Sequence, residues 1–137
     1  MNFKIVRQDR DPSTAVLEKD VATTDLDSGL FCAIDANGLA VKADATSTEI
    51  AYVYDVISET EVLVAKGNNL VLEGTADAPF AKTNRNTEVD NAIDGSGNQN
   101  IDLGASTTDV FKVISSTDAG KVGETTVRVV INKPIAL

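Results

Sequence analysis

Apolar residues in this chain recur at every second position, and this period limits the possible folds more than any other feature. In the segment TTVRVVI, residues 125–131, Val127, Val129 and Ile131 would share one face of a strand. Such alternation is typical of half-buried β-strands, whereas a helix needs apolar residues three and four positions apart. No segment has a convincing helical stripe. We therefore predict an all-β fold of about seven short strands joined by turn-rich connections, in a small barrel or sandwich.

The length of 137 residues suits one domain, or one domain that carries an ordered arm. The run Phe3–Arg7 alternates weakly and is followed by the proline-containing stretch QDRDPST. We expect residues 1–20 to form an extended N-terminal arm and residues 21–137 a single β domain. As an alternative, Asp11 before Pro12 could begin a short helix through residues 15–17, because proline suits the first helical position.

The stretch LFCAIDANGLAVKA, residues 30–43, predicts a β-hairpin. Asn37-Gly38 between two apolar runs is a strong hairpin signal, because both turn residues must accept positive φ. A two-residue loop would place Cys32 opposite Ala43, whereas a three-residue loop would place it opposite Lys42. We favour the two-residue loop, since a slip of one residue reverses every side chain. That register gathers one apolar face: Leu30, Cys32, Ile34, Leu39 and Val41.

Further strands are expected on both sides of a polar segment. The run Glu49–Ile57 is apolar on both faces, which predicts a central strand or half of a subunit contact. Val62–Gly74 predicts a second strand–turn–strand unit. Residues 76–109 are dense in Asn, Asp, Gly and Ser, so we expect a long polar loop or insert there. Strands resume at Val110–Ile114 and at residues 125–131.

Catalytic groups are scarce. The chain has no histidine, which removes the commonest general base and metal ligand. The single cysteine, Cys32, lies among apolar residues, and free cysteine in such a setting usually behaves as a small core hydrophobe. We therefore expect a core thiol, no enzyme activity and no cofactor.

Two short patterns resemble ligand sites without matching them. The stretch DAGKVGET, residues 118–125, has Val122 where a phosphate-binding loop needs Ser or Thr. The stretch Asp90–Asp102 is rich in oxygen ligands, but Ile101 stands where a calcium loop needs a bidentate Glu. A turn and a solvated loop are the favoured interpretations, and a ligand- or calcium-binding module remains an alternative.

The net charge is −9, with single cations scattered along the chain. Binding to nucleic acid would need a concentrated basic patch, so we do not expect it. No apolar run is long enough to cross a membrane as a helix. The opening MNFKIVRQDRDP carries charges within its apolar run, which is not typical of a signal peptide. We expect synthesis in a cytoplasm, with export only as part of a larger assembly.

The segment Thr24–Thr75 resembles the head decoration proteins of tailed bacteriophages, including the lambda type. The resemblance rests on TDLDSGLFCAIDANGLAVKADATSTEIAYVYDVISETEVLVAKGNNL. This stretch shows a strand entered at a Gly, a turn of Asp, Asn and Gly, an apolar return strand, a polar loop and another apolar strand. The resemblance implies a small β-tulip-like fold without an active site.

The same resemblance implies a function. Decoration proteins bind the outer capsid surface and cement subunits of the major capsid protein, as homotrimers or sometimes as monomers. In the lambda type an N-terminal arm adds a strand to the capsid lattice. By this analogy the candidates for partner binding are Phe3, Lys4, Ile5, Val6 and Arg7, although these residues do not themselves match a motif. The protein would then be a virion component made in the host bacterial cytoplasm. A tail-tube or fibre-associated subunit is the alternative within the same particle.

Overall fold

The computed structural model describes residues 2–8, 13–65, 70–117 and 120–137. These residues form β-strands and a single 3₁₀ turn, η1 (Lys82–Asn84), with no α-helix among them. No described segment makes a helix long and apolar enough for a membrane span. The strands are β1 (Lys4–Gln8), β2 (Thr14–Glu18), β3 (Phe31–Ile34), β4 (Ala40–Lys42), β5 (Ala51–Val56), β6 (Glu61–Ala65), β7 (Leu70–Thr75), β8 (Glu88–Ile93), β9 (Gln99–Asp102), β10 (Phe111–Ser116) and β11 (Thr126–Ile131).

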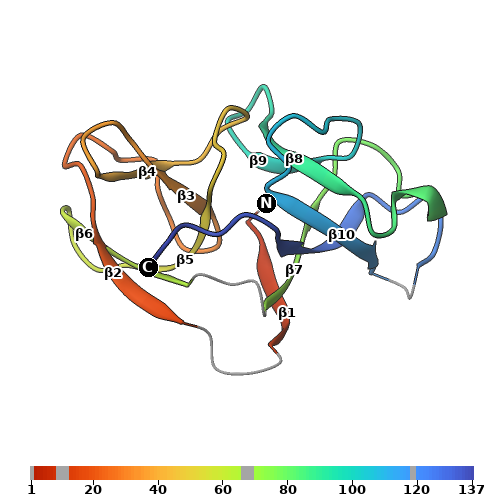
Figure 1. Cartoon of the computed structure of the whole chain (residues 1–137), viewed down its shortest axis with the longest axis horizontal. Helices are drawn as coiled ribbons and strands as arrows, with labels where there is room; N and C mark the ends of the chain where they lie inside the picture. Colours follow the sequence, from red (N-terminus) through yellow and green to blue (C-terminus); the bar gives the residue numbers. More distant parts are fainter. Residues whose placement is uncertain (1, 9–12, 66–69, 118–119) are drawn as a thin grey trace.

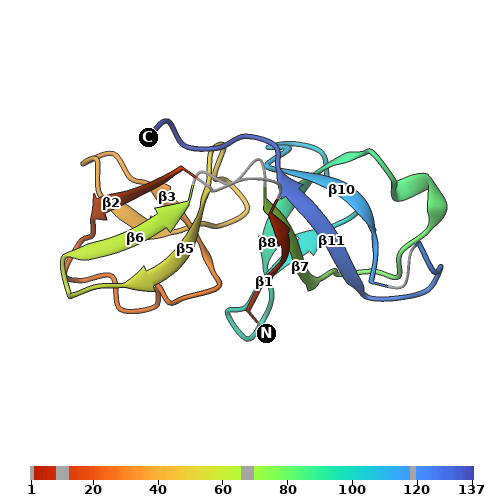
Figure 2. The same ribbon diagram turned by 90° about the horizontal axis from the view of Figure 1, so that it is seen from below.

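The strands form two antiparallel sheets. One sheet has six strands in the order β1-β7-β11-β10-β8-β9, and the other has five in the order β2-β6-β5-β3-β4. We call β2–β6 the first lobe and β7–β11 with β1 the second lobe; they lie side by side in both views (Figures 1 and 2). The prediction of an all-β fold is confirmed. The sheets are not closed into barrels, and the arrangement is sandwich-like.

The two lobes repeat one topology. Each lobe has five strands that follow one another in the chain, β2–β6 in the first and β7–β11 in the second. In space the two sets have the same order, β2-β6-β5-β3-β4 and β7-β11-β10-β8-β9, so the first strand lies beside the fifth in both. In each lobe the fourth and fifth strands pair with an irregularity at the same place, after Val53 in β5 and after Val113 in β10. An isolated parallel bridge follows the first strand of each lobe, at Lys19 and at Ala76. The chain is thus built from two copies of one five-stranded unit.

Backbone hydrogen bonds fix which residues correspond. The Lys19 N–H donates to Thr60 O at 2.7 Å, and the Ala76 N–H donates to Thr125 O at the same distance. Position by position, Val16 therefore corresponds to Glu73 and Leu17 to Gly74.

A second pair of positions confirms the correspondence. The Gly29 N–H donates to Val53 O at 3.0 Å, and the Asn86 N–H donates to Val113 O at 2.9 Å. Both residues adopt positive φ, +86° for Gly29 and +61° for Asn86.

Two apolar cores hold the molecule together. The smaller core consists mainly of first-lobe residues, including Cys32, Val53 and Val62, and is joined by Ile135 near the end of the chain. The larger core combines residues of both lobes, such as Phe31 from β3 and Phe111 from β10. Because the larger core crosses from one lobe to the other, the lobes pack as one body. Strand β5 is the middle strand of its sheet, as its two apolar faces predicted.

The predicted register of the first hairpin is wrong. Cys32 pairs with Lys42 and Ile34 with Ala40, so the loop has three residues rather than two. The Asp35 carboxylate closes this longer loop by accepting the N–H groups of Asn37 at 2.8 Å and Leu39 at 3.0 Å. These side-chain hydrogen bonds favour the three-residue loop over the two-residue turn. The prediction considered only the apolar residues and therefore missed them.

The apolar face predicted for this hairpin does not exist either. Strand β3 is buried on both faces, with Phe31 in the larger core and Cys32 in the smaller one. Ile34, assigned to the same face as Cys32, is 40% exposed. Alternation could not select the register, because neither face of β3 is polar.

The long polar loop expected at residues 76–109 is also wrong, since this segment contains η1, β8 and β9. The β8–β9 hairpin contributes Val89 and Ile101 to the larger core. Gln99 is buried, and its amide bonds the Phe31 N–H and C=O, both at 2.8 Å, and the Ala43 C=O at 2.9 Å. A polar residue thus ties the lobes together, which an apolar pattern does not detect.

Three further expectations concern the N-terminal and middle strands. Residues 14–18 form strand β2, so the alternative of a short helix there is wrong. The strands predicted within Val62–Gly74 exist as β6 and β7, but they belong to different sheets. Within residues 1–20, β1 pairs with β7 and β2 pairs with β6, so both strands are built into the sheets. Residues 9–12, including the Asp11-Pro12 pair, lie outside the described residues.

Candidate partner-binding edge

Strand β1 is the edge of the six-stranded sheet and contains four of the five residues predicted to bind a partner. The fifth, Phe3, precedes the strand and is 3% exposed. Its ring packs edge-on to Phe31 with centroids 4.6 Å apart, and stacks on Phe111 at 5.7 Å. Phe3 therefore anchors the start of β1 between the two lobes.

A missing side chain makes room for this anchor. Gly74 in β7 faces Phe3, and a Cβ at Gly74 would overlap the aromatic ring. The Phe3 N–H also donates to Gly29 O at 2.8 Å, and the Tyr52 hydroxyl donates to Phe3 O at 3.3 Å. Asn2 adds a bond from its side-chain amide to Ser28 O at 2.7 Å. The N-terminal residues are held by contacts to both lobes.

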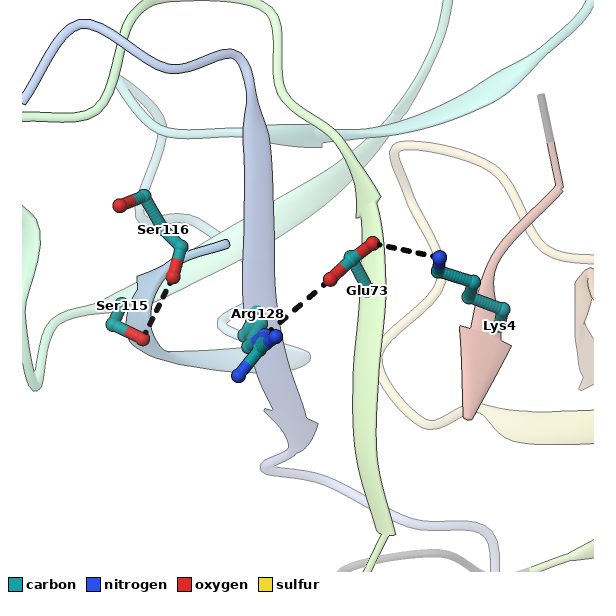
Figure 3. Close-up of polar contacts among 5 residues, drawn as sticks. All are labelled: Lys4, Glu73, Ser115, Ser116 and Arg128. Carbon is teal, nitrogen blue, oxygen red and sulfur yellow. Dashed lines mark hydrogen bonds and ion pairs between the residues drawn. The ribbon is translucent and has the colours of Figure 1, made fainter. Parts of the chain in front are cut away.

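A line of alternating charges crosses the sheet beside β1 (Figure 3). The Glu73 carboxylate accepts Lys4 Nζ at 3.2 Å on one side and Arg128 Nε at 3.3 Å on the other. Glu73 is 9% exposed, whereas the Lys4 side chain is 71% exposed. Next to Arg128, the Ser115 hydroxyl donates to Ser116 O at 3.0 Å. The buried carboxylate has two cationic partners, and Lys4 keeps most of its surface available.

The five predicted residues thus divide into anchors and exposed groups. Phe3 is buried and Ile5 packs partly against the larger core. Lys4, Val6 and Arg7 are exposed. The pairing of β1 with β7 is irregular between Ile5 and Arg7, which makes Val6 the extra residue of a bulge. Strand β1 is therefore an exposed, basic edge strand with an anchored beginning.

The single cysteine lies in structural surroundings. Cys32 is fully buried, and burial raises the pKa of its thiol to about 12. A thiol with so high a pKa is not a nucleophile at neutral pH. The prediction that Cys32 is a core residue is confirmed, although the register that led to it was wrong.

The carboxylates of the calcium-loop candidate bind backbone N–H groups. Asp90 accepts the N–H groups of Thr107, Thr108 and Asp109 at 2.8–3.1 Å. Burial would raise the pKa of Asp90, but these backbone hydrogen bonds outweigh it and lower the pKa. The described residues contain no group of three or more acidic or sulfur side chains placed to hold a metal ion.

Asp94, another residue of the calcium-loop candidate, closes the turn between β8 and β9 in the way that Asp35 closes the turn between β3 and β4. It accepts the N–H groups of Ser96 at 2.8 Å and Asn98 at 2.9 Å. The bond from Asn98 and then the bond from Ser96 lower the pKa of Asp94. The sequence contains a signal for this repetition, since Ala-Ile-Asp occurs at residues 33–35 and again at 92–94, each followed by a Gly three residues after the Asp.

Sequence reasoning missed two features of the edges. It did not foresee the ion pairs of Glu73, because they join β1, β7 and β11 from distant parts of the chain. It also did not single out β2, which lies at the edge of the five-stranded sheet. Comparison with protein-family models, curated proteins and solved structures finds no match for this chain.

Proposed function

We propose that this protein is a virion structural subunit that binds the outer surface of a phage capsid and cements neighbouring subunits of the major capsid protein. The observation that carries the proposal is the form of β1. The start of this strand is locked into the core by Phe3, while Lys4, Val6 and Arg7 are exposed at a sheet edge. A strand presented in this way is suited to β-augmentation, in which a partner strand completes the ladder.

Three other features are consistent with the proposal. The pattern of strands and turns within Thr24–Thr75 resembles the decoration proteins. A core that spans both lobes gives the rigid body that a cementing protein needs. The net charge of −9 keeps such a protein soluble until it meets its capsid. Binding as a homotrimer, as in the lambda type, belongs to the same proposal.

Cosedimentation with purified capsids tests the proposal. The protein is expected to pellet with expanded capsids and to remain in the supernatant with unexpanded ones. The paired substitution Lys4→Glu with Arg7→Glu should weaken pelleting, because it reverses the charge of the β1 edge. Lys121→Glu with Lys112→Glu changes the net charge equally and serves as the matched control. Absence of binding to any capsid in mild salt would contradict the proposal, and assembly of the isolated protein into tubes would favour a tail-tube subunit.

A further inference from the structure

Strand β2 occupies the position in the first lobe that β7 occupies in the second. In the second lobe this strand is covered by β1, which gives that sheet its sixth strand. In the first lobe no described strand pairs with the outer side of β2. One molecule therefore shows the same edge twice, once occupied and once open.

The open edge does not leave the first lobe incomplete. In the second lobe Gly74 leaves a space that the Phe3 ring of the added strand fills. At the equivalent position of β2 stands Leu17, whose own side chain packs partly against the first-lobe core. Leu17 thus supplies, from β2 itself, an apolar side chain at the position where the second lobe takes one from the added strand. The edge is free to bind a further strand.

The backbone of β2 is regular enough to continue the sheet. Its five residues pair with β6 in an unbroken register from Thr14 to Glu18. Lys19 N–H points toward β6, so by alternation the N–H and C=O groups of Thr14, Val16 and Glu18 point away from it. The far edges of the two sheets are shorter: β4 has three residues and β9 has four. Natural edge strands are often protected by such shortness, and β2, with five residues in regular register, is not.

The side chains of β2 indicate the chemistry of the partner. Val16, in the middle of the strand, is 51% exposed and offers an apolar contact to a partner. Glu18 lies directly opposite Glu61 of β6, and both are exposed. Like charges in such a cross-strand pair are destabilising. Among the described residues no cation forms an ion pair with either glutamate.

A basic strand would relieve this repulsion, and the second lobe contains one. The edge of β7 also carries a glutamate, Glu73, and the strand that covers it supplies Lys4 to that carboxylate at 3.2 Å. We propose that the β2 edge binds, by strand addition, an extended segment of another protein that carries an apolar and a basic residue two positions apart, and therefore on one face of the strand. The apolar residue would cover Val16, and the basic residue would lie beside Glu18, on the side away from Glu61.

The test uses the full-length protein and a synthetic peptide of residues 2–8, NFKIVRQ, as a basic, apolar probe strand. Titration is followed by backbone amide NMR at low salt. We expect saturable shifts centred on Thr14, Val16 and Glu18. Val16→Pro removes one outward N–H without touching the β2–β6 ladder and should abolish binding, whereas Val16→Thr keeps the N–H and should retain it.

Charge is tested separately, in a way that does not depend on the folding of Val16→Pro. Glu18→Gln combined with Glu61→Gln should weaken binding of the peptide by roughly threefold or more. A peptide carrying Lys4→Glu and Arg7→Glu should not bind. Equal binding of both peptides would overturn the proposal, as would shifts confined to β7 or no shifts at millimolar peptide.

A second copy of this chain is the competing occupant. If the protein alone forms a dimer that Val16→Pro dissociates, and the peptide does not compete, the edge serves self-association and the proposal is wrong. The peptide titration contains no capsid, so a negative result does not contradict the proposal that the protein binds a capsid. Equally, a failure to bind capsids in the cosedimentation test would not contradict peptide binding at the β2 edge.

Discussion

Gly74 lies beneath the ring of Phe3, so closely that a Cβ at this position would overlap the aromatic carbons. This contact joins β1 to β7 and helps bring the N-terminus into the core shared by the two lobes. It also explains why β1 can carry exposed charged residues and still be a fixed part of the fold.

The Phe3–Gly74 contact predicts strong coupling between the two positions. Phe3→Ala should lower the free energy of unfolding by about 3–5 kcal/mol, as other buried Phe truncations do. Gly74→Ala should also destabilise the protein, because the ring must move. In the Phe3→Ala background, however, Gly74→Ala should cost much less. A double-mutant cycle by urea denaturation measures the coupling, and additive effects would contradict the contact.

The two Asp-closed turns provide a matched pair of glycines. Gly38 and Gly97 have φ of +79° and +81°, and a Cβ added at either position would have no atom within 4 Å. Substitution by Ala at either site therefore tests backbone strain alone, and we expect a loss of about 1–2 kcal/mol at each. Gly95→Ala in the same β8–β9 turn has equal space without positive φ. Thermal unfolding of the three variants measures these effects, and Gly95→Ala should be close to neutral.

The burial of Cys32 predicts an inert thiol. Iodoacetamide should label the native protein far more slowly than the urea-unfolded chain, because the side chain is buried and the pKa of Cys32 is raised to about 12. Cys32→Ala should lower the free energy of unfolding by about 1–2 kcal/mol. Mass spectrometry of the labelled protein checks the first result. Rapid labelling at neutral pH in the folded state would show that the first-lobe core is open.

Asp90 predicts part of the acid sensitivity of the fold. Its pKa is lowered in the native state from the ordinary 3.8, so the unfolded chain binds the proton more readily. The stability that Asp90 contributes is therefore complete above its unfolded pKa and is lost as the pH falls from about 5 through the native pKa. Asp90→Asn should lower stability at pH 7 and flatten the decline below pH 5. Urea midpoints for both proteins across pH 2.5–7 measure this.

Asp102 should act in the opposite sense to Asp90. Burial, followed by the neighbouring charge of Asp77, raises the pKa of Asp102. The native state therefore holds this proton more tightly than the unfolded chain, and the contribution of Asp102 to stability falls as the pH rises through its native pKa. Asp90→Asn and Asp102→Asn should thus change the acid profile in opposite directions. An unchanged profile in Asp90→Asn would mean that other carboxylates govern the transition.

The sequence predicted most strands but not how they are distributed. Alternation located β5 and β11 because one face or both faces of each strand meet an apolar core. It failed for β8 and β9, where the buried polar residues Asp90 and Gln99 interrupt the apolar pattern around Val89 and Ile101. It failed for the first hairpin because the Asp35 carboxylate determines the loop.

The alternation of apolar residues did not reveal the repeated topology, for a related reason. The two units share hydrogen bonds and bulges more than side chains, as the pairs Gly29 with Asn86 and Leu17 with Gly74 illustrate. Two short repeats mark it in the sequence: Ala-Ile-Asp at residues 33–35 and 92–94, and Glu-Thr-x-Val-x-Val at residues 59–64 and 124–129. The open β2 edge follows from the comparison of the two units, so it could not be identified before the fold was known.

Cryo-microscopy of a phage particle that carries this protein is the most direct test of the central claim. We predict density for both lobes on the outer shell, with β1 facing the major capsid protein and with contacts to more than one capsid subunit. Density in the tail or fibres, or a position in which the protein touches a single capsid subunit without bridging, would contradict the cementing function.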